Sequence, residues 1–337
     1  MANSIGVAIP TFRRPRQLER ALRSVLAQTR QPDEIHVSDD ADDHATRSMV
    51  GRLGAGHIRY SCDHGHVGMN ENWTYCLRSS TCDVVAILED DDFWLTSHLS
   101  RAEAGLDDGG ALYHSPHVEA WDTGETLEEY KTVHSPWHDL GCVSKPSPEA
   151  VMLDALGGGT INSSTVALRR EALKGVPDFD GRYLMGMDTV MWARIGLLGG
   201  VCYGPDPGAV YTYHGENVSS GLLATRTATV QARAARRMLL LETLEVRAHV
   251  VYKVISLLSE ADAGVAASAS IVLLHRSVPK EVRSAVWEAI RYRNDVLRAS
   301  RHLALAQVAG PGIVGIADLV DEALRVLRST SVAVGRG

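Results

Sequence analysis

Apolar positions along the first hundred residues alternate between two spacings. Short runs of consecutive apolar residues, typical of buried parallel strands, alternate with segments in which apolar residues recur every three or four positions, as on one face of a helix. The expected strands are Ile5–Pro10, Glu34–Ser38, His57–Tyr60 and Asp83–Leu88, and the expected helices are Arg16–Gln28, Asp43–Leu53 and Gly68–Ser80. Strands that alternate with helices over short connections predict an α/β fold with a mostly parallel sheet flanked by helices.

The pattern becomes less regular after residue 110. Ala111–Pro148 mixes Trp, His and Pro with polar residues, so we expect long loops or an irregular insertion there. Further along, Ser163–Leu168 and Val210–Tyr213 predict strands, and Asp188–Leu198, Thr227–Leu258 and Lys280–Ala309 predict helices. From residue 222 onward Ala, Leu and Arg dominate. We therefore expect two parts of one α/β domain, residues 1–110 and 111–221, and a C-terminal helical subdomain, residues 222–337.

Composition favours a soluble globular protein. Of the 337 residues, 45% are hydrophobic and 22% are charged. The longest apolar stretches fall short of the ~18–20 residues that a membrane span needs, and the first residues lack the basic and apolar regions of a signal peptide. We expect no transmembrane segment and a cytoplasmic location. Five scattered cysteines without a CxxC pair argue against a disulfide framework and a thiolate zinc site.

The net charge of −7 is unevenly distributed. Residues 1–221 carry 18 Lys and Arg against 31 Asp and Glu, a net −13, whereas residues 222–337 carry 16 against 10, a net +6. The acidic first part argues against a nucleic-acid partner. The basic tail could contact a phosphate, a membrane surface or another copy, or form a solvated face. Its amphipathic spacing favours packing against the rest of the chain or homo-oligomerisation.

Acidic residues follow two of the predicted strands. Asp90, Asp91 and Asp92 come after Val84–Leu88, and Asp39-Asp40 follow Glu34–Ser38. The carboxyl ends of parallel strands meet at one edge of a sheet, where ligands bind. Clustered acids raise one another's pKa unless a cation offsets them, and oxygen ligands suit Mg²⁺ or Mn²⁺. The cluster therefore predicts a metal site for a phosphate-bearing substrate, with a solvated acidic loop as the alternative.

No glycine-rich phosphate loop accompanies these acids. The chain has neither GxGxxG after the first strand nor GxxxxGK[ST], so a nucleotide would need a metal to hold its phosphates. Five segments in order resemble the inverting glycosyltransferases of family 2, which have the GT-A fold. They are Val7–Phe12 (first strand), Pro32–Asp40 (second strand), Gly68–Trp73 (the GM-x-x-NW variant of the third helix), Glu89–Asp92 (the DxD motif) and Tyr211–Ser219 (the closing YxxHxxNxS stretch).

The resemblance implies roles for individual residues. Asp40 would accept the uracil N3–H of a UDP-sugar, and Asp90 would contact the ribose. Asp92, with Asp91 and His214, would bind Mn²⁺ or Mg²⁺ on the diphosphate. The nucleotide-sugar site as a whole would comprise Pro10, Thr11, Phe12, Arg14, Asp39, Asp40, Asn70, Asp90 and Asp91.

The resemblance also places the general base at Asp188, which opens a predicted helix. An ionised carboxylate there could take the proton of the acceptor hydroxyl, although an Asp at a helix start could equally be an N-cap. Two positions depart from the family pattern. Met187 replaces the usual acid before the base, and Thr212 replaces a common Arg or Lys, so Arg182 or Arg226 could help to stabilise the diphosphate.

The resemblance implies an enzyme that moves one sugar with inversion from a nucleoside-diphosphate sugar to a soluble small-molecule or glycan acceptor. The chain lacks the Q-x-x-R-W motif of processive synthases. Its composition hints at a bacterial source, where such enzymes decorate specialised metabolites or surface-glycan precursors. The alternatives are a sugar-nucleotide nucleotidyltransferase and a non-catalytic binding protein of the same fold.

Overall fold

The computed structural model describes residues 3–54, 58–62, 65–124, 126–135, 145–157, 159–181, 183, 185–215, 217, 226–247, 249–251 and 254. The chain divides into two compact units, Met1–Gly221 and Leu222–Gly337. In the second unit, helix α8 spans Arg226–Val246. The predicted helix Lys280–Ala309 lies outside the described residues. So do residues 248, 252–253 and 255–258 of the predicted helix Thr227–Leu258.

A seven-stranded sheet forms the centre of the first unit, in the order β10-β6-β9-β4-β1-β2-β3. Among the described strands of this sheet, only β9 runs antiparallel to its neighbours, so the predicted mostly parallel α/β class is confirmed. The strands are β1 (Ile5–Thr11), β2 (Glu34–Asp39), β3 (Ile58–Ser61), β4 (Val84–Ile87), β6 (Leu112–His114), β9 (Ala167–Arg169) and β10 (Val201–Tyr203). Because this sheet takes strands from both sides of residue 110, residues 1–110 and 111–221 form a single structural unit.

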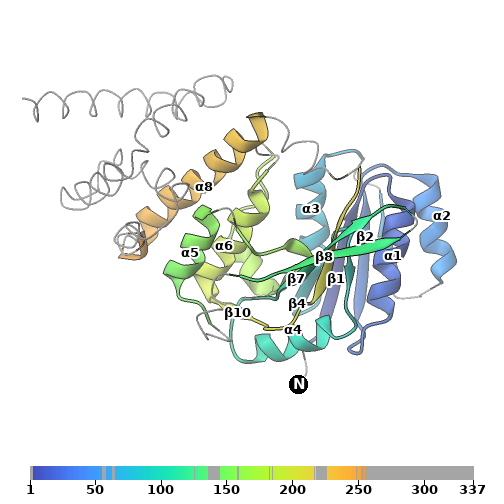
Figure 1. The fold of residues 1–337 in the computed structure, drawn as a ribbon, viewed down its shortest axis with the longest axis horizontal. Helices are drawn as coiled ribbons and strands as arrows, with labels where there is room; N and C mark the ends of the chain where they lie inside the picture. The colour runs from blue at the N-terminus through green and yellow to red at the C-terminus, as the bar shows by residue number, and fades with distance from the viewer. Residues whose placement is uncertain are drawn as a thin grey trace, which may run out of the picture. The chain divides into compact units, whose positions relative to one another are not determined.

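Helices cover both faces of this sheet. Figure 1 shows α1 and α2 on one side of β1 and β2, and α3 on the other. The helices of the first unit are α1 (Pro15–Leu26), α2 (His44–Leu53), α3 (Met69–Arg78), α4 (His98–Asp107), α5 (Pro148–Gly157) and α6 (Met187–Gly199), with short 3₁₀ helices at Ser163–Thr165 and Arg170–Gly175. The two-sided cover explains why β1 and β4 consist of nearly continuous buried apolar residues.

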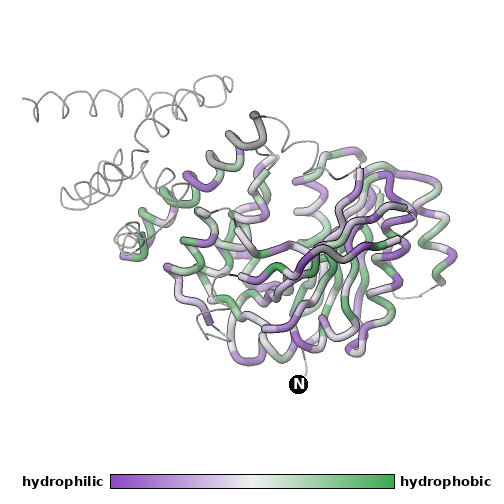
Figure 2. Tube along the Cα trace, in the orientation of Figure 1, coloured by the Kyte–Doolittle hydropathy of each residue, from purple (hydrophilic) through white to green (hydrophobic). Residues whose placement is uncertain are grey.

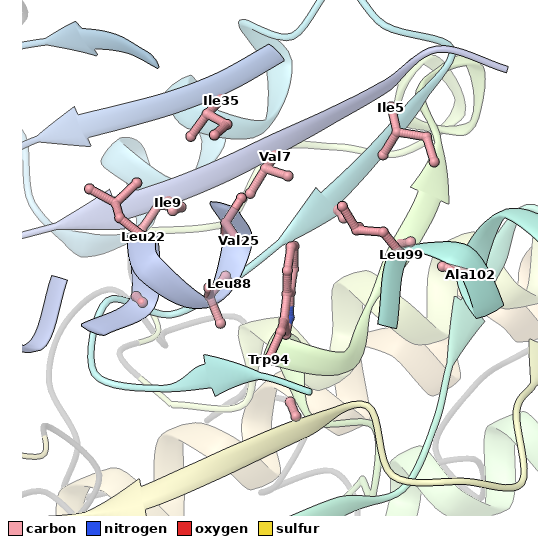
Figure 3. Close-up of a cluster of buried hydrophobic side chains, with 14 of the residues drawn as sticks. Ile5, Val7, Ile9, Leu22, Val25, Ile35, Leu88, Trp94, Leu99 and Ala102 are labelled. Carbon is pink, nitrogen blue, oxygen red and sulfur yellow. The ribbon is translucent and has the colours of Figure 1, made fainter. Parts of the chain in front are cut away.

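The core lies between the sheet and α1 and α4. Val7 and Ile9 of β1 point toward Leu22 and Val25 of α1, and Leu99 of α4 closes the other end of the cluster (Figure 3). The hydropathy colouring shows apolar residues gathered along the central strands and polar residues on the outer helices (Figure 2). The apolar spacing of α1 therefore predicted its buried face correctly.

A smaller sheet lies beside the first and contains the main error of the sequence-based prediction. Its order is β5-β11-β7-β8, with β5 (Phe93–Trp94), β11 (Ala209–Tyr213), β7 (His117–Asp122) and β8 (Leu127–Val133). The expectation of an irregular Ala111–Pro148 was wrong, because that segment contains β6, β7 and β8. Charged residues interrupt β7 and β8, as in a half-exposed sheet, so neither strand shows an apolar run.

One predicted strand was also wrong in part, and two helices were missed. The predicted strand Ser163–Leu168 begins instead as a 3₁₀ helix, since the Asn162 side chain accepts a hydrogen bond from the backbone N of Ser164 at 2.9 Å and turns the chain. Helices α4 and α5 were not anticipated. Helix α4 does carry buried residues at helical spacing, at Leu99, Ala102 and Leu106, which is the signal that could have revealed it.

Three histidines are buried around the junction of the two sheets. The ring of His98 lies 4.6 Å from Trp94, centroid to centroid, and neither of its ring nitrogens has a hydrogen-bond partner in the described part of the chain. Burial, with a smaller effect of the Arg101 charge, lowers the pKa of His98 to about 3. Burial likewise lowers the pKa of His114 to about 3 and that of His117 to about 4.

Acid is therefore expected to destabilise the fold through these histidines. They stay neutral in the folded state while the unfolded chain takes up protons below about pH 6.5, so each costs about 1.4 kcal/mol per pH unit below that value. Because His98→Phe removes one of these groups, the variant should gain stability relative to wild type on acidification: the difference in unfolding free energy, variant minus wild type, should be about 2 kcal/mol larger at pH 5 than at pH 7.5. Urea unfolding at both pH values measures this difference.

The exposed His44 provides the matched control for that experiment. His44→Gln should follow wild type at both pH values. The raised carboxyl pKa values described below act in the opposite direction, but they are common to all three proteins and cancel in the comparison. An equal pH dependence of His98→Phe and wild type would contradict the prediction.

Candidate active site

The predicted acids gather where β1, β2 and β4 end. Asp90 makes a direct side-chain contact with the last residue of β1. Its Oδ2 accepts a hydrogen bond from Thr11 Oγ1 at 2.7 Å, and its Oδ1 lies 3.0 Å from Arg14 Nη1. Burial and the charge of Asp91 raise the pKa of Asp90 to about 6, against the opposing effects of Arg14 and Thr11. The structure thus brings the predicted Thr11, Arg14 and Asp90 together.

Asp91 lies where three segments of the chain meet. Its Oδ2 is 2.7 Å from Arg14 Nη1, 3.1 Å from His214 Nε2 and 3.3 Å from Asn217 Nδ2. Arg14 precedes α1, whereas His214 and Asn217 follow β11, so this one carboxylate joins the start of the first unit to its end. Although burial opposes the charged form, the carboxylates of Asp90 and Asp91 raise the pKa of Arg14. Arg14 is thus the cation that partly neutralises the pair.

Asp92 points into the protein rather than toward a ligand. It is fully buried, and its two carboxylate oxygens accept hydrogen bonds from Thr212 N at 2.9 Å and Ser164 Oγ at 2.6 Å. Burial and the charge of Asp91 raise the pKa of Asp92 well above its usual value. The sequence analysis assigned Asp92 to the metal; in the structure its two oxygens join β11 to the segment before β9.

Two further acids lie within electrostatic range of this cluster. Burial, together with the charges of Asp92, Asp91 and Asp188, raises the pKa of Glu89 well above its usual value. Asp188 belongs to the first turn of α6, whose N-cap is Gly186 in the left-handed region, with φ 83°. Asp188 is therefore not the N-cap, which was the alternative interpretation of this residue. Glu89 was not assigned a role from sequence, although the acidic run itself was the available signal.

Helix α1 supplies a cation beside Thr212. Arg20 Nη2 donates to the backbone O of Asp91 at 2.7 Å and to Thr212 Oγ1 at 3.2 Å, and Arg20 Nη1 pairs with Asp122 at 2.6 Å. A guanidinium thus lies next to the position where the family pattern has a basic residue. The sequence analysis proposed Arg182 and Arg226 instead. Arg182 lies outside the described residues, and Arg226 begins α8 in the second unit.

The two acids after β2 have protein partners of their own. Fully buried Asp39 accepts hydrogen bonds from Ala41 N and Asp43 N, both at 2.9 Å, and from Tyr60 OH at 2.6 Å. These contacts shape the turn after β2. Asp40 accepts from the loop before α3, from Val67 N at 2.7 Å, Gly68 N at 3.0 Å and the His66 ring at 2.9 Å.

Three further residues were predicted to bind the nucleotide-sugar donor, namely Phe12, Pro10 and Asn70. Phe12 is 41% exposed, and its ring stacks on His66 with centroids 5.0 Å apart, beside Asp40. Pro10 is buried within β1. Asn70 uses its side-chain amide to donate to the carbonyls of Asp180, at 2.8 Å, and Tyr183, at 2.7 Å. Asn70 therefore ties α3 to the segment before α6.

Comparison with known proteins identifies the family. Residues 6–175, half of the chain, match the model of glycosyl transferase family 2. The chain belongs to that family. As a family 2 member it is a glycosyltransferase, and the resemblance found in the sequence is confirmed.

Two curated proteins are related to this glycosyltransferase in sequence. An uncharacterised protein of Mycobacterium tuberculosis is 24% identical over 228 residues, which cover 66% of this chain and 71% of that protein. The GalNAc(5)-diNAcBac-PP-undecaprenol β-1,3-glucosyltransferase of Campylobacter jejuni is 33% identical over 110 residues, which cover 32% of this chain and 36% of that enzyme.

Solved structures of low sequence identity share the fold. S. aureus TarS 1–349 in complex with UDP-GlcNAc superposes with a TM-score of 0.61 at 16% identity, covering 90% of this chain and 83% of TarS. The mannosyltransferase PcManGT of Pyrobaculum calidifontis, in complex with GDP-Man and Mn²⁺, gives a TM-score of 0.52 at 16% identity, covering 97% and 81%. These likenesses support the GT-A type of architecture. No helix among the described residues is long and apolar enough to cross a membrane.

The donor atoms around Asp91 suit a divalent cation that is shared with a substrate. The described residues contain no group of three or more His, Cys, Asp or Glu arranged to hold a metal alone. Mg²⁺ and Mn²⁺ are commonly bound by one or two carboxylates together with substrate phosphates. Asp91 and His214 offer such a partial set, next to carboxyls whose pKa values are raised by burial and by the neighbouring carboxylates.

Proposed function

We propose that this glycosyltransferase moves a single sugar, with inversion, from a nucleoside-diphosphate sugar to a soluble acceptor, and that it depends on Mn²⁺ or Mg²⁺. The observation that carries the proposal is the meeting of Asp90, Asp91 and His214 at one rim, with Arg14 as their nearby cation and Asp188 within electrostatic range of Glu89. Family membership argues against a nucleotidyltransferase, and the retained acids argue against a non-catalytic protein.

The donor is proposed to be a UDP-sugar. TarS has been solved with UDP-GlcNAc and UDP, which supports this nucleotide, and the GDP-Man complex of PcManGT supports the wider class. The exposed Phe12–His66 ring pair could stack on the base. Asp40 accepts hydrogen bonds from the His66 ring and from Val67 N and Gly68 N, which places its carboxylate beside this ring pair, where it is proposed to accept the base N–H.

Asp91 and His214 are proposed to hold the cation, in place of Asp92. When bound, the cation would neutralise the charge that develops on the diphosphate leaving group. Arg14 keeps the carboxylates of Asp90 and Asp91 in place, and Arg20 fixes the backbone of Asp91. Asp188 is proposed to accept the proton of the acceptor hydroxyl as it attacks the anomeric carbon from the face opposite the nucleotide.

A thermal-shift and hydrolysis experiment tests this function. UDP or a UDP-sugar at ~100 times its Kd should stabilise the fold by about 2.7 kcal/mol, which corresponds to a few degrees in Tm, when Mn²⁺ is present. Without acceptor, the enzyme should slowly hydrolyse the donor. Chelation with EDTA should remove both effects. Stabilisation by GDP or TDP in preference to UDP would overturn the choice of nucleotide, and unchanged hydrolysis in EDTA would overturn the metal dependence.

A further inference from the structure

Three aromatic rings line one face of the four-stranded sheet. Tyr211 and Tyr213 are two residues apart on β11 and so share a face, and the parallel pairing of β11 with β7 sets Tyr213 opposite Trp121. The rings of Trp121 and Tyr213 stack with centroids 5.0 Å apart and an interplanar angle of 30°, while Tyr211 meets Tyr213 edge-on at 4.9 Å. These three residues, here called the aromatic platform, form a continuous row of ring contacts.

Trp121 is the exposed end of this platform. It is 52% exposed, although its neighbours on the same face of β7, His117 and Glu119, are buried. Among the large hydrophobic side chains of the described residues, it is the only exposed tryptophan. An indole supported on one side by Tyr213 presents apolar surface to solvent, and exposed apolar surface of this kind is typical of binding sites.

Charged groups hold the platform in place and give it a polar edge. Tyr213 OH donates to Glu119 Oε1 at 2.9 Å, and Glu119 Oε2 pairs with Lys131 at 3.2 Å. A fixed aromatic surface bordered by hydrogen-bonding groups matches a pyranose ring, which has an apolar C–H face and hydroxyls around its edge. A homodimer interface fits less well, since it would need about 800 Å² of mostly apolar surface from each partner.

The aromatic platform and the acid cluster are linked through residues that are adjacent in sequence. Tyr213 directly precedes His214, whose Nε2 lies 3.1 Å from Asp91. Trp121 directly precedes Asp122, which pairs with Arg20, and Arg20 in turn donates to the backbone O of Asp91. Both strands that carry the platform therefore continue into contacts with the residues proposed to hold the donor.

We propose that Trp121 and Tyr213 bind a pyranose ring of the acceptor, which makes the acceptor a carbohydrate. This inference rests on the proposed sugar transfer at the Asp91 rim and names the substrate class for it. Stacking on the indole would hold the acceptor sugar next to the donor without taking part in the reaction. Trp121 is thus a specificity residue, and its loss should raise the acceptor KM and leave donor hydrolysis unchanged.

The test measures sugar binding directly with the full chain and without a donor. The probes are methyl glucopyranosides, methyl 2-acetamido-2-deoxyglucopyranosides and the corresponding disaccharides, detected by saturation-transfer NMR. Wild type should transfer saturation to the C–H protons of at least one probe. Trp121→Ala should weaken that binding about tenfold or more, while Trp121→Phe should weaken it about threefold. Leu127→Ala, which removes an exposed apolar residue of the adjacent β8, should bind like wild type.

The outcomes separate this inference from the proposed function. Absence of saturation transfer from wild type to every probe overturns the inference, as does equal binding by Trp121→Ala and wild type with all variants folded. A change in oligomeric state of Trp121→Ala, measured by light scattering, assigns the surface to a second copy and also overturns it. The proposed function fails separately, if wild type neither binds nor hydrolyses any nucleoside-diphosphate sugar while sugar binding by the platform persists.

Discussion

Replacing Asp91 with Asn is expected to lower kcat/KM for sugar transfer by roughly 10³-fold while the fold stays intact. Asn has the same shape, so it can still contact Arg14 and Asn217, but it lacks the negative charge that a diphosphate-bound cation needs. Loss of one preorganised electrostatic group at a reacting centre typically costs 10²–10³-fold, and loss of a cation adds to that. Because Asp91 is one of the residues proposed to hold the cation, Mn²⁺ affinity should fall in parallel.

Asp92→Asn is the matched control for this experiment. Its amide would replace one oxygen that now accepts a hydrogen bond from Thr212 N or Ser164 Oγ in a fully buried site. The unsatisfied donors should lower the unfolding free energy by about 1–3 kcal/mol. Enzyme kinetics, Mn²⁺ binding followed by electron paramagnetic resonance, and urea unfolding compare the two variants. If Asp92→Asn lost Mn²⁺ binding at unchanged stability while Asp91→Asn kept it, Asp92 would be restored as the ligand.

The rim of acids was predictable because its signal is local. An apolar run rich in β-branched residues ends at Leu88 and is followed directly by the acids Glu89–Asp92, and the strand–helix alternation makes the neighbouring strand ends coincide. The different contacts made by the three aspartates Asp90–Asp92 could not be predicted in this way. It depends on Ser164 and Thr212, which lie 72 and 120 residues from Asp92 and reach it through β9 and β11. Nothing in the local sequence shows which carboxylate meets these two donors.

Arg20 and the smaller sheet escaped prediction for a related reason. The apolar face of α1 identifies Leu18, Leu22 and Val25 as buried, but a basic residue flanking that face has no local mark that distinguishes it from a solvated one. Its partners Asp122 and Thr212 lie on β7 and β11. Since β7 is stabilised by pairing with β8 and β11 rather than by an apolar run of its own, its polar residues resemble a loop until the sheet is known.

A single electrostatic arrangement accounts for the chemistry proposed at this rim. Burial, together with the charges of neighbouring carboxylates, raises the pKa values of Asp90, Asp92 and Glu89, and Arg14 pairs with Asp90 and Asp91. Such a site disfavours further negative charge, so a diphosphate needs an accompanying cation to enter. Binding of the donor and of the metal should therefore be mutually dependent, which distinguishes this rim from a glycine-rich phosphate loop.

Replacing Asp188 with Asn should lower kcat by about 10²–10⁴-fold with little change in donor KM. A general base in proton transfer contributes about this factor, while the carboxylates of Asp90 and Asp91 are held by Arg14. The stability change should be small, about 0.3–1 kcal/mol, from the lost interaction of the charge with the first turn of α6. Steady-state kinetics as a function of pH measures the effect.

Glu89→Gln is the comparison that makes the Asp188 assignment falsifiable. Glu89 is a carboxylate of the same cluster to which no role is assigned. Burial and neighbouring charges, including that of Asp188, raise its pKa well above its usual value. Asp188→Asn should abolish the acid limb of the kcat profile, because the group that must be ionised is gone, whereas Glu89→Gln should retain it. The reverse result, with Glu89→Gln losing the limb and Asp188→Asn keeping wild-type kcat, would transfer the role of general base to Glu89.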